Sequence, residues 1–182
     1  EGITDARKFM SAARHFARAK PIIVVKAGKF GESAKAAASH TGAIAGSDRI
    51  YDAVFAQTGI LRAKDMEEFF DAGKALVLQP PAIGKNIGII TDAGGPGIMA
   101  VDECELKGLN VKRFSDETIQ KFEKLKEDNR LPKFATNLNP VDITGSGTSE
   151  MFELAAEVLF QDPEVHGIIL LGLHQTPALQ ED

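Results

Sequence analysis

The sequence is poor in cysteine and has no tryptophan: Cys104 is the only cysteine among 182 residues. A single cysteine excludes an intrachain disulfide and fits a reducing compartment. Cysteines are too few, and the four histidines are not spaced as metal ligands usually are, so we expect no metal site. Apolar runs are too short to cross a bilayer and no secretory signal leads the chain, so we expect a cytoplasmic protein with no membrane partner.

Long basic blocks are also missing. The formal net charge is −5 at pH 7, which argues against nucleic acid as the main partner. Hydrophobic residues make up 43% of the chain and charged residues 26%, as in ordinary globular proteins. The chain starts at Glu1 rather than at methionine and ends just after a predicted strand, so we expect a piece of a longer protein.

Short apolar strands alternate with amphipathic helices along the whole chain, at spacings typical of parallel crossover units. The predicted fold is therefore α/β, with two flavodoxin-like (Rossmann-like) three-layer lobes and mostly parallel sheets. Two prolines and a glycine interrupt the pattern near residues 79–85 and predict a boundary. We expect a first lobe over 1–80, a linker over 81–85 and a second lobe over 86–182. Predicted helices include 4–19, 47–58 and one opening at Asp65, and predicted strands are 22–25, 60–62, 86–91, 110–114, 140–144 and 165–173.

The stretch from Ser39 to Gly46 carries a histidine among small residues, in a region (26–46) that we predict to be a loop. A neutral imidazole can act as a covalent nucleophile as well as a proton carrier. Gly42 and Gly46 allow backbone N–H groups to converge on an anion. Ser47 is expected to cap the next helix, whose N-terminus would face the stretch. From the residues alone, a loop histidine that merely bonds a backbone carbonyl remains an alternative.

A second glycine-rich turn, Ala93-Gly94-Gly95-Pro96-Gly97, joins a strand to a helix and is a candidate phosphate site through Gly94, Gly95 and Gly97. It also fits the dinucleotide pattern G-x-G-x-x-A, but the acidic residue expected after the second strand is missing, so NAD or FAD binding is a weak alternative. Another alternative is a turn that only packs the helix against the strand. In the third loop, 142–149, Asp142 could serve catalysis or simply accept backbone N–H bonds, and Asp92 has the same ambiguity.

Four segments, in this order along the chain, resemble ADP-forming (NDP-forming) acyl-CoA synthetases of the acetate–CoA ligase kind, which are similar to succinyl-CoA synthetases. The resemblance implies that His40 becomes a phosphohistidine and that Glu1, in an E-G-I context, holds its other ring nitrogen. It also implies a phosphate cradle made by Ser39, Thr41, Gly42 and Gly46 together with Gly94, Gly95 and Gly97. The segments are Lys20–Gly28, Ser39–Asp48, Thr91–Gly97 and Asn139–Gly145.

The resemblance further implies a reaction, in which acyl-CoA, ADP and phosphate are interconverted with a free acid, CoA and ATP. CoA and ADP or ATP with Mg would enter as substrates through domains absent here, an N-terminal CoA-binding domain and an ATP-grasp domain or subunit. We therefore expect an oligomer, no tightly bound cofactor in this fragment and no turnover by the fragment alone. Acetate is the default acid, with phosphate as the other small substrate.

A non-catalytic role is the alternative. Related CoA-ligase-like modules are regulatory parts of protein acetyltransferases, and many of them have lost the reactive histidine. The intact motif around His40 favours the enzyme.

Overall fold

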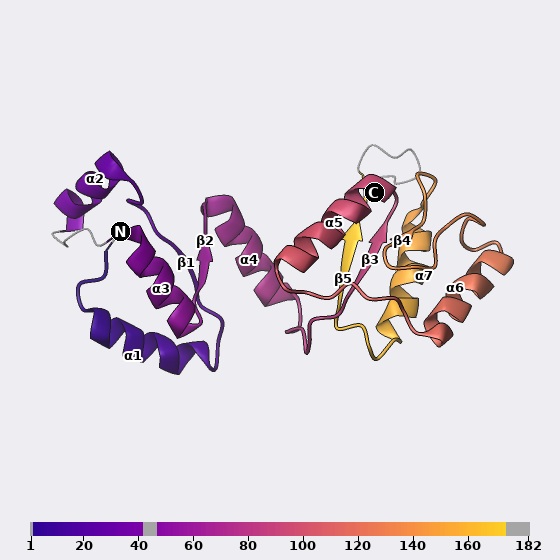
Figure 1. Ribbon diagram of the computed structural model, residues 1–182, viewed down its shortest axis with the longest axis horizontal. Coiled ribbons are helices and arrows are strands. Elements are labelled where there is room, and N and C mark those ends of the chain that lie inside the picture. Colours follow the sequence, from indigo (N-terminus) through magenta and orange to yellow (C-terminus); the bar gives the residue numbers. More distant parts are fainter. Residues whose placement is uncertain (1, 42–46, 174–182) are drawn as a thin grey trace. The chain divides into compact units, whose positions relative to one another are not determined.

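The computed structural model describes residues 2–41 and 47–173, with only the backbone of His40 and Thr41. The chain divides into two compact units, Glu1–Pro81 and Ala82–Asp182, hereafter unit 1 and unit 2. Both are α/β with parallel strands, which confirms the predicted fold class (Figure 1). No helix within the described ranges is long and apolar enough to cross a membrane.

Unit 1 is built on two short parallel strands that pair Val24 with Arg62. Val24 faces the first and third helices, whose buried Ala13 and Phe55 form the core with it, while the neighbouring Ile23 faces the fourth helix on the other side of the sheet. The unit therefore has the three layers that the alternating pattern predicted. Its elements are α1 (Ala6–Ala17), β1 (Ile23–Val25), α2 (Gly31–Thr41), α3 (Asp48–Thr58), β2 (Leu61–Ala63) and α4 (Met66–Leu78).

The prediction of a loop over 26–46 was wrong for residues 31–41, because Gly31–Thr41 forms α2; residues 42–46 lie outside the described part of the chain. Its sequence contains four alanines, the best helix former, and Glu32 lies in its first turn, where the helix dipole favours a carboxylate. At the start of α2, the Ser33 hydroxyl accepts from the Phe30 N–H and donates to the Phe30 carbonyl. His40 therefore lies in the last turn of a helix rather than inside a loop.

The faces of α3 and α4 differ in part from the prediction. Helical spacing predicts Ile50, Val54 and Phe55 inward on α3, but Ile50 is exposed and Tyr51 is buried instead, one helical turn before Phe55. On α4, Phe70 and Val77 are exposed, although helical spacing predicts one inward apolar stripe of Phe69, Phe70, Leu76 and Val77. Periodicity identified the helices but not which side of each contacts the rest of its unit.

Unit 2 contains a parallel sheet of strand order β4-β3-β5. Alternate residues of the central strand face opposite sides: Ile89 packs with Cys104 of α5, and Ile90 packs with Phe122 of α6 and Leu159 of α7. Cys104 is buried. The elements are β3 (Ile87–Thr91), α5 (Gly94–Leu106), α6 (Asp116–Glu127), β4 (Val141–Asp142), α7 (Ser149–Phe160) and β5 (Gly167–Leu171).

The predicted strand over 110–114 is reduced to one parallel bridge between Asn86 and Asn110. The side chain of Asn139 explains this. Its amide oxygen accepts from the Ile89 N–H, and its amide nitrogen donates to the carbonyls of Ile87 and Lys112. Because Asn139 occupies the hydrogen-bonding groups of β3 that a neighbouring strand would need, pairing stops after Asn110.

Candidate functional site

The structure describes only part of the predicted site. His40 and Thr41 end α2, and their side chains lie outside the described part of the chain; Glu1, Gly42 and Gly46 lie outside it altogether. Ser39 is described, and its hydroxyl donates to the Lys35 carbonyl at 3.0 Å, so this proton is already used within α2. The described neighbours of residues 42–46 are the end of α2 and the start of α3.

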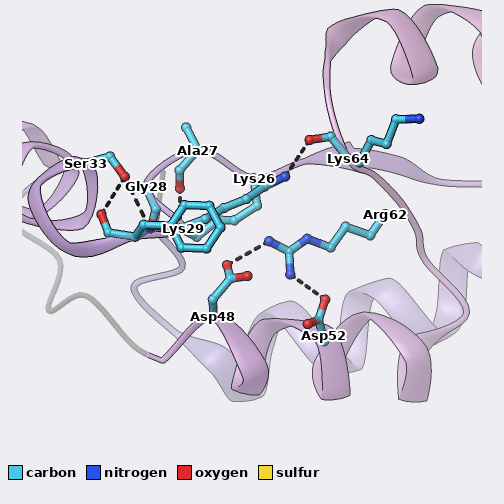
Figure 2. A network of polar contacts seen from close by, with 10 residues as sticks. Lys26, Ala27, Gly28, Lys29, Ser33, Asp48, Asp52, Arg62 and Lys64 are labelled. Atoms are coloured by element: carbon cyan, nitrogen blue, oxygen red, sulfur yellow. Dashed lines mark hydrogen bonds and ion pairs between the residues drawn. The ribbon is translucent and has the colours of Figure 1, made fainter.

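The start of α3 is held by Arg62, a residue that sequence analysis missed. Its Nη2 donates to Oδ1 of Asp48 at 2.7 Å and its Nη1 donates to Oδ1 of Asp52, one turn further along the helix. Figure 2 shows the guanidinium between the two carboxylates. The side chain of Arg62 is only 14% exposed, and its Cζ lies 5.9 Å from the centre of the Phe55 ring. Ser47 precedes α3 as predicted, but its hydroxyl makes no capping bond to any residue that the structure describes.

These contacts shift the pKa values of Asp48 and Arg62. The hydrogen bond from Arg62 lowers the pKa of Asp48, and the positive charges of Arg62, Lys26 and Lys29 lower it further, while partial burial opposes them. In return, hydrogen bonds to Asp48 and Asp52 raise the pKa of Arg62. Asp48 and Arg62 are therefore both ionised at neutral pH.

Two lysines lie near the same helix start. Lys26, directly after β1, is 7% exposed. Its ammonium donates to the carbonyls of Ala27 and Gly28 and lies 4.6 Å from the centre of the Tyr51 ring. Lys29 donates to the backbone carbonyl of Lys64, the residue after β2 (Figure 2). Lys26, Lys29 and Arg62 thus place positive charge on the described side of the site.

Glycine is required in the turn between β1 and α2. Gly28 has a φ of +69°, and a Cβ placed on it would lie 2.8 Å from Cβ of Ala37. Only glycine fits both the left-handed backbone and this close approach to α2. The turn that leads to the His40 helix is therefore sterically defined.

The second predicted cradle lies at the start of α5 in unit 2. Gly94 and Gly95 are exposed, and no described side chain caps this helix. Gly97 is different: its N–H donates to the Ala93 carbonyl, and a Cβ would lie 3.0 Å from Cγ2 of Thr91. Gly97 thus has a packing role, and its N–H is already used.

Two aspartates near this edge of the sheet bond backbone groups. Oδ1 of Asp142 accepts from the Thr144 N–H at 2.8 Å, and Oδ2 of Asp142 would lie 3.3 Å from a Cβ on Gly94. The buried carboxylate of Asp92 accepts from the Leu173 N–H. The structure thus gives both aspartates the loop-orienting contacts that sequence analysis considered. Within 2–41 and 47–173, no group of three or more His, Cys, Asp or Glu side chains could hold a metal ion.

Comparison with known proteins identifies both units. A family described as the succinyl-CoA ligase like flavodoxin domain matches residues 1–76, and the ligase-CoA domain matches residues 87–179. Acetate–CoA ligase (ADP-forming) I subunit alpha of Pyrococcus furiosus is 44% identical over 94% of this chain and 36% of its own length. Acetate–CoA ligase (ADP-forming) I of Archaeoglobus fulgidus is 43% identical over the whole chain and 25% of its own length.

A solved structure agrees. The dinucleotide forming acetyl-coenzyme A synthetase 1 of Ca. Korarchaeum cryptofilum, in complex with phosphate and ADP, superimposes with a TM-score of 0.86 at 36% identity. The match covers 98% of this chain and 38% of that one. The chain spans between a quarter and two fifths of the length of these relatives. These matches confirm the predicted resemblance: the chain belongs to the ligase-CoA domain family, and its first unit matches the succinyl-CoA ligase like flavodoxin domain.

Proposed function

We propose that this chain is the CoA-ligase part of an ADP-forming acyl-CoA synthetase that works through a phosphohistidine at His40. The observation that carries the proposal is the intact segment Ser39–Asp48 in a chain whose relatives are named ADP-forming acetate–CoA ligases. The related structure holds ADP and phosphate, two of the substrates that this reaction needs. The relatives named above are ligases by name, and none is named a regulatory module.

The proposed reaction has three transfers. An oxygen of phosphate attacks the thioester carbonyl and the C–S bond breaks. This step releases CoA and leaves an acyl phosphate. A ring nitrogen of His40 then attacks phosphorus, and the P–O bond to the acyl group breaks to release the acid. Finally a β-phosphate oxygen of ADP, supplied with Mg, attacks the same phosphorus and the N–P bond to His40 breaks, giving ATP and neutral His40. Glu1 would hold the other ring nitrogen and favour the charged phosphohistidine.

Helix starts can stabilise the phosphoryl group. We propose that the N–H groups of Gly42 and Gly46 before α3 and the hydroxyl of Thr41 bind it. Ser39 would join them only after its hydroxyl leaves its bond to the Lys35 carbonyl. The exposed Gly94 and Gly95 at the uncapped start of α5 would bind phosphate as well. Each helix terminus contributes about 0.3–1 kcal/mol at an exposed site and up to about 2 kcal/mol when partly buried. The proximity of Lys26 and Lys29 to the start of α3 supports this proposal.

The rest of the reaction needs other parts. We propose that a CoA-binding domain and an ATP-grasp domain or subunit supply CoA and the nucleotide with Mg, in an oligomeric enzyme. This agrees with relatives that are between about two and a half and four times as long as the matched region. Acetate is the proposed acid.

An activity assay tests the proposal. The full-length protein containing this chain, with its ATP-grasp partner, is given acetyl-CoA, ADP, Mg²⁺ and phosphate, and ATP formation is measured. We expect ATP in the wild type, none in His40→Ala, and the wild-type rate in His15→Ala, which removes an exposed histidine of α1. No ATP from acetyl-CoA or from a panel of branched and aromatic acyl-CoA esters would contradict the enzyme and favour a non-catalytic regulatory module.

A further inference from the structure

The outward face of α1 carries a stripe of positive charge. Its residues are exposed and follow one another at intervals of four, three and four positions, which places them on one side of the helix. We name them the α1 stripe: Arg7, Ser11, Arg14 and Arg18. The sequence of α1 itself contains no Asp or Glu. Within residues 2–41 and 47–173, no carboxylate forms an ion pair with any of these three arginines.

Exposed cations elsewhere in the protein differ from the α1 stripe. Several lysines pair with a carboxylate one helical turn away, as in Lys8–Asp5, Lys35–Glu32 and Lys107–Glu103. Arg7 also lies in the first turn of α1, where the helix dipole disfavours a cation. A charge that breaks such a local preference with no ion pair among the described residues is expected where a surface binds a partner.

α7 carries a stripe of negative charge. Three exposed carboxylates lie on one side of this helix, at intervals of three and four positions, and we name them the α7 stripe: Glu150, Glu153 and Glu157. Glu150 lies 3.8 Å from Arg130, and this exposed pair is weak. None of the described cations pairs with Glu153 or Glu157. Glu157 lies in the last turn of α7, where the helix dipole disfavours a carboxylate.

The two stripes match in spacing when the helices run in opposite directions. Counting back from Arg14, the α1 stripe steps by three and then four positions, as the α7 stripe does counting forward from Glu150. In this register Arg14 faces Glu150, Ser11 faces Glu153 and Arg7 faces Glu157. The register therefore pairs Arg7 with Glu157, the two charges that their own helix dipoles disfavour.

The net charges of the two units show where an acidic partner is available. Residues 1–81 contain 12 Lys and Arg against 9 Asp and Glu, a net charge of +3. Residues 82–182 contain 9 against 17, a net charge of −8. Opposite charge steers two molecules together and fixes the register of their contact. A second copy of the same protein thus offers the acidic helix face that the α1 stripe lacks.

We propose that α1 of one copy binds α7 of a second copy in antiparallel orientation, through the pairs Arg14–Glu150 and Arg7–Glu157, with the Ser11 hydroxyl donating to Glu153. The inference does not depend on the function proposed above. Two such contacts, one in each direction, make a twofold dimer. Exposed ion pairs are weak one by one and are screened by salt, so the association should be reversible and sensitive to salt.

Sedimentation equilibrium of the 182-residue chain tests the contact. In about 20 mM salt, where screening is slight, the average mass should rise with concentration above the 19.5 kDa of the monomer. In about 0.5 M salt the association constant should be at least about tenfold lower. A wild-type chain that stays monomeric at every concentration in low salt would overturn the proposal.

Charge reversal tests the register. Arg7→Glu with Arg14→Glu, and separately Glu150→Arg with Glu157→Arg, should each weaken the association at least about tenfold, because like charges then face each other. All four side chains are exposed, so both double variants should keep the circular dichroism spectrum of the wild type. Lys85→Glu with Lys133→Glu is the matched control, since it changes the net charge equally at exposed positions outside both stripes and should associate like the wild type.

Mixing the two double variants gives the sharpest result. In the mixture, the acidic α1 of one variant meets the basic α7 of the other, and the unchanged stripes also meet. The mixture should therefore associate within about threefold of the wild type although neither variant does so alone. A mixture that stays monomeric, or a double variant that associates as strongly as the lysine control, would overturn the proposal.

Discussion

Replacing Asp162 with alanine should destabilise unit 2 by about 3 kcal/mol. Asp162 follows α7, is 3% exposed and reaches the start of α6. Its carboxylate accepts from the hydroxyls of Thr118, at 2.6 Å, and Ser115, at 3.3 Å, and from the Glu164 N–H at 2.9 Å. A hydrogen bond to a charged group contributes about 1.5–3 kcal/mol, and a buried donor left without an acceptor costs about 1–3 kcal/mol. Thr118 is such a donor, because it is itself buried.

Hydrogen exchange of the chain can measure this loss. The slowest amides of β3 should exchange roughly 100-fold faster in Asp162→Ala, which corresponds to about 3 kcal/mol. Asp128→Ala is the matched control, because it removes an exposed carboxylate from the C-terminal end of α6, where the helix dipole disfavours it. A change in Asp162→Ala no larger than in the control would refute the reasoning.

The carboxyl group of Asp162 should also make the stability of unit 2 depend on pH. Burial alone would raise the pKa of Asp162, but the hydrogen bonds from Thr118, Glu164 and Ser115 together lower it. A carboxyl whose folded pKa is depressed stabilises the protein above its unfolded pKa of about 3.9 and loses this effect as the pH falls through the folded pKa. The stability difference between wild type and Asp162→Asn should therefore shrink below about pH 4. A difference that grows on acidification would contradict the assignment.

Two further predictions concern unit 2. Gly147→Ala should lower the free energy of unfolding in urea by about 1–2 kcal/mol, because its Cβ would lie 2.7 Å from Cδ1 of Ile143 and 3.2 Å from a backbone oxygen. Gly145→Ala, with no described neighbour within 4 Å, should change little. Equal effects of the two substitutions would contradict the steric argument. Burial, with the charge of Glu103, raises the pKa of the Cys104 thiol, so thiol reagents should modify Cys104 only after unfolding in urea, and stoichiometric labelling of the native chain at neutral pH would show otherwise.

Local pattern predicted much of the fold. The apolar run from Ile87 to Thr91 is buried at every position, as expected for a central parallel strand. Asp65 caps α4 as predicted, by accepting from the Glu68 N–H, although the Glu68 carboxylate reaches back to Lys64 rather than to Asp65. The loop prediction failed over 31–41 because glycine and serine favour turns, whereas the alanines of α2 favour a helix and prevail there.

Interactions between distant residues could not be predicted in this way. Arg62 bonds partners 10 and 14 positions away, and nothing in a three-residue strand indicates which helix its side chain will meet. Asn139 bonds β3 from 50 positions away and ends a strand pairing that the apolar pattern favoured. Likewise, the packing role of Gly97 depends on its contact with Thr91, which only the folded structure brings beside it. These positions depend on tertiary contacts, which the periodicity of one segment does not contain.

Peptide mass spectrometry of the phosphorylated protein tests the central claim most directly. The full-length protein with its ATP-grasp partner is incubated with Mg-ATP, and separately with acetyl-CoA and phosphate, and digested under conditions that preserve acid-labile phosphate. We predict a phosphoryl group on the His40 peptide from both directions, and none in His40→Ala. A complete, folded assembly that carries no phosphate on His40 from either direction would contradict the phosphohistidine mechanism.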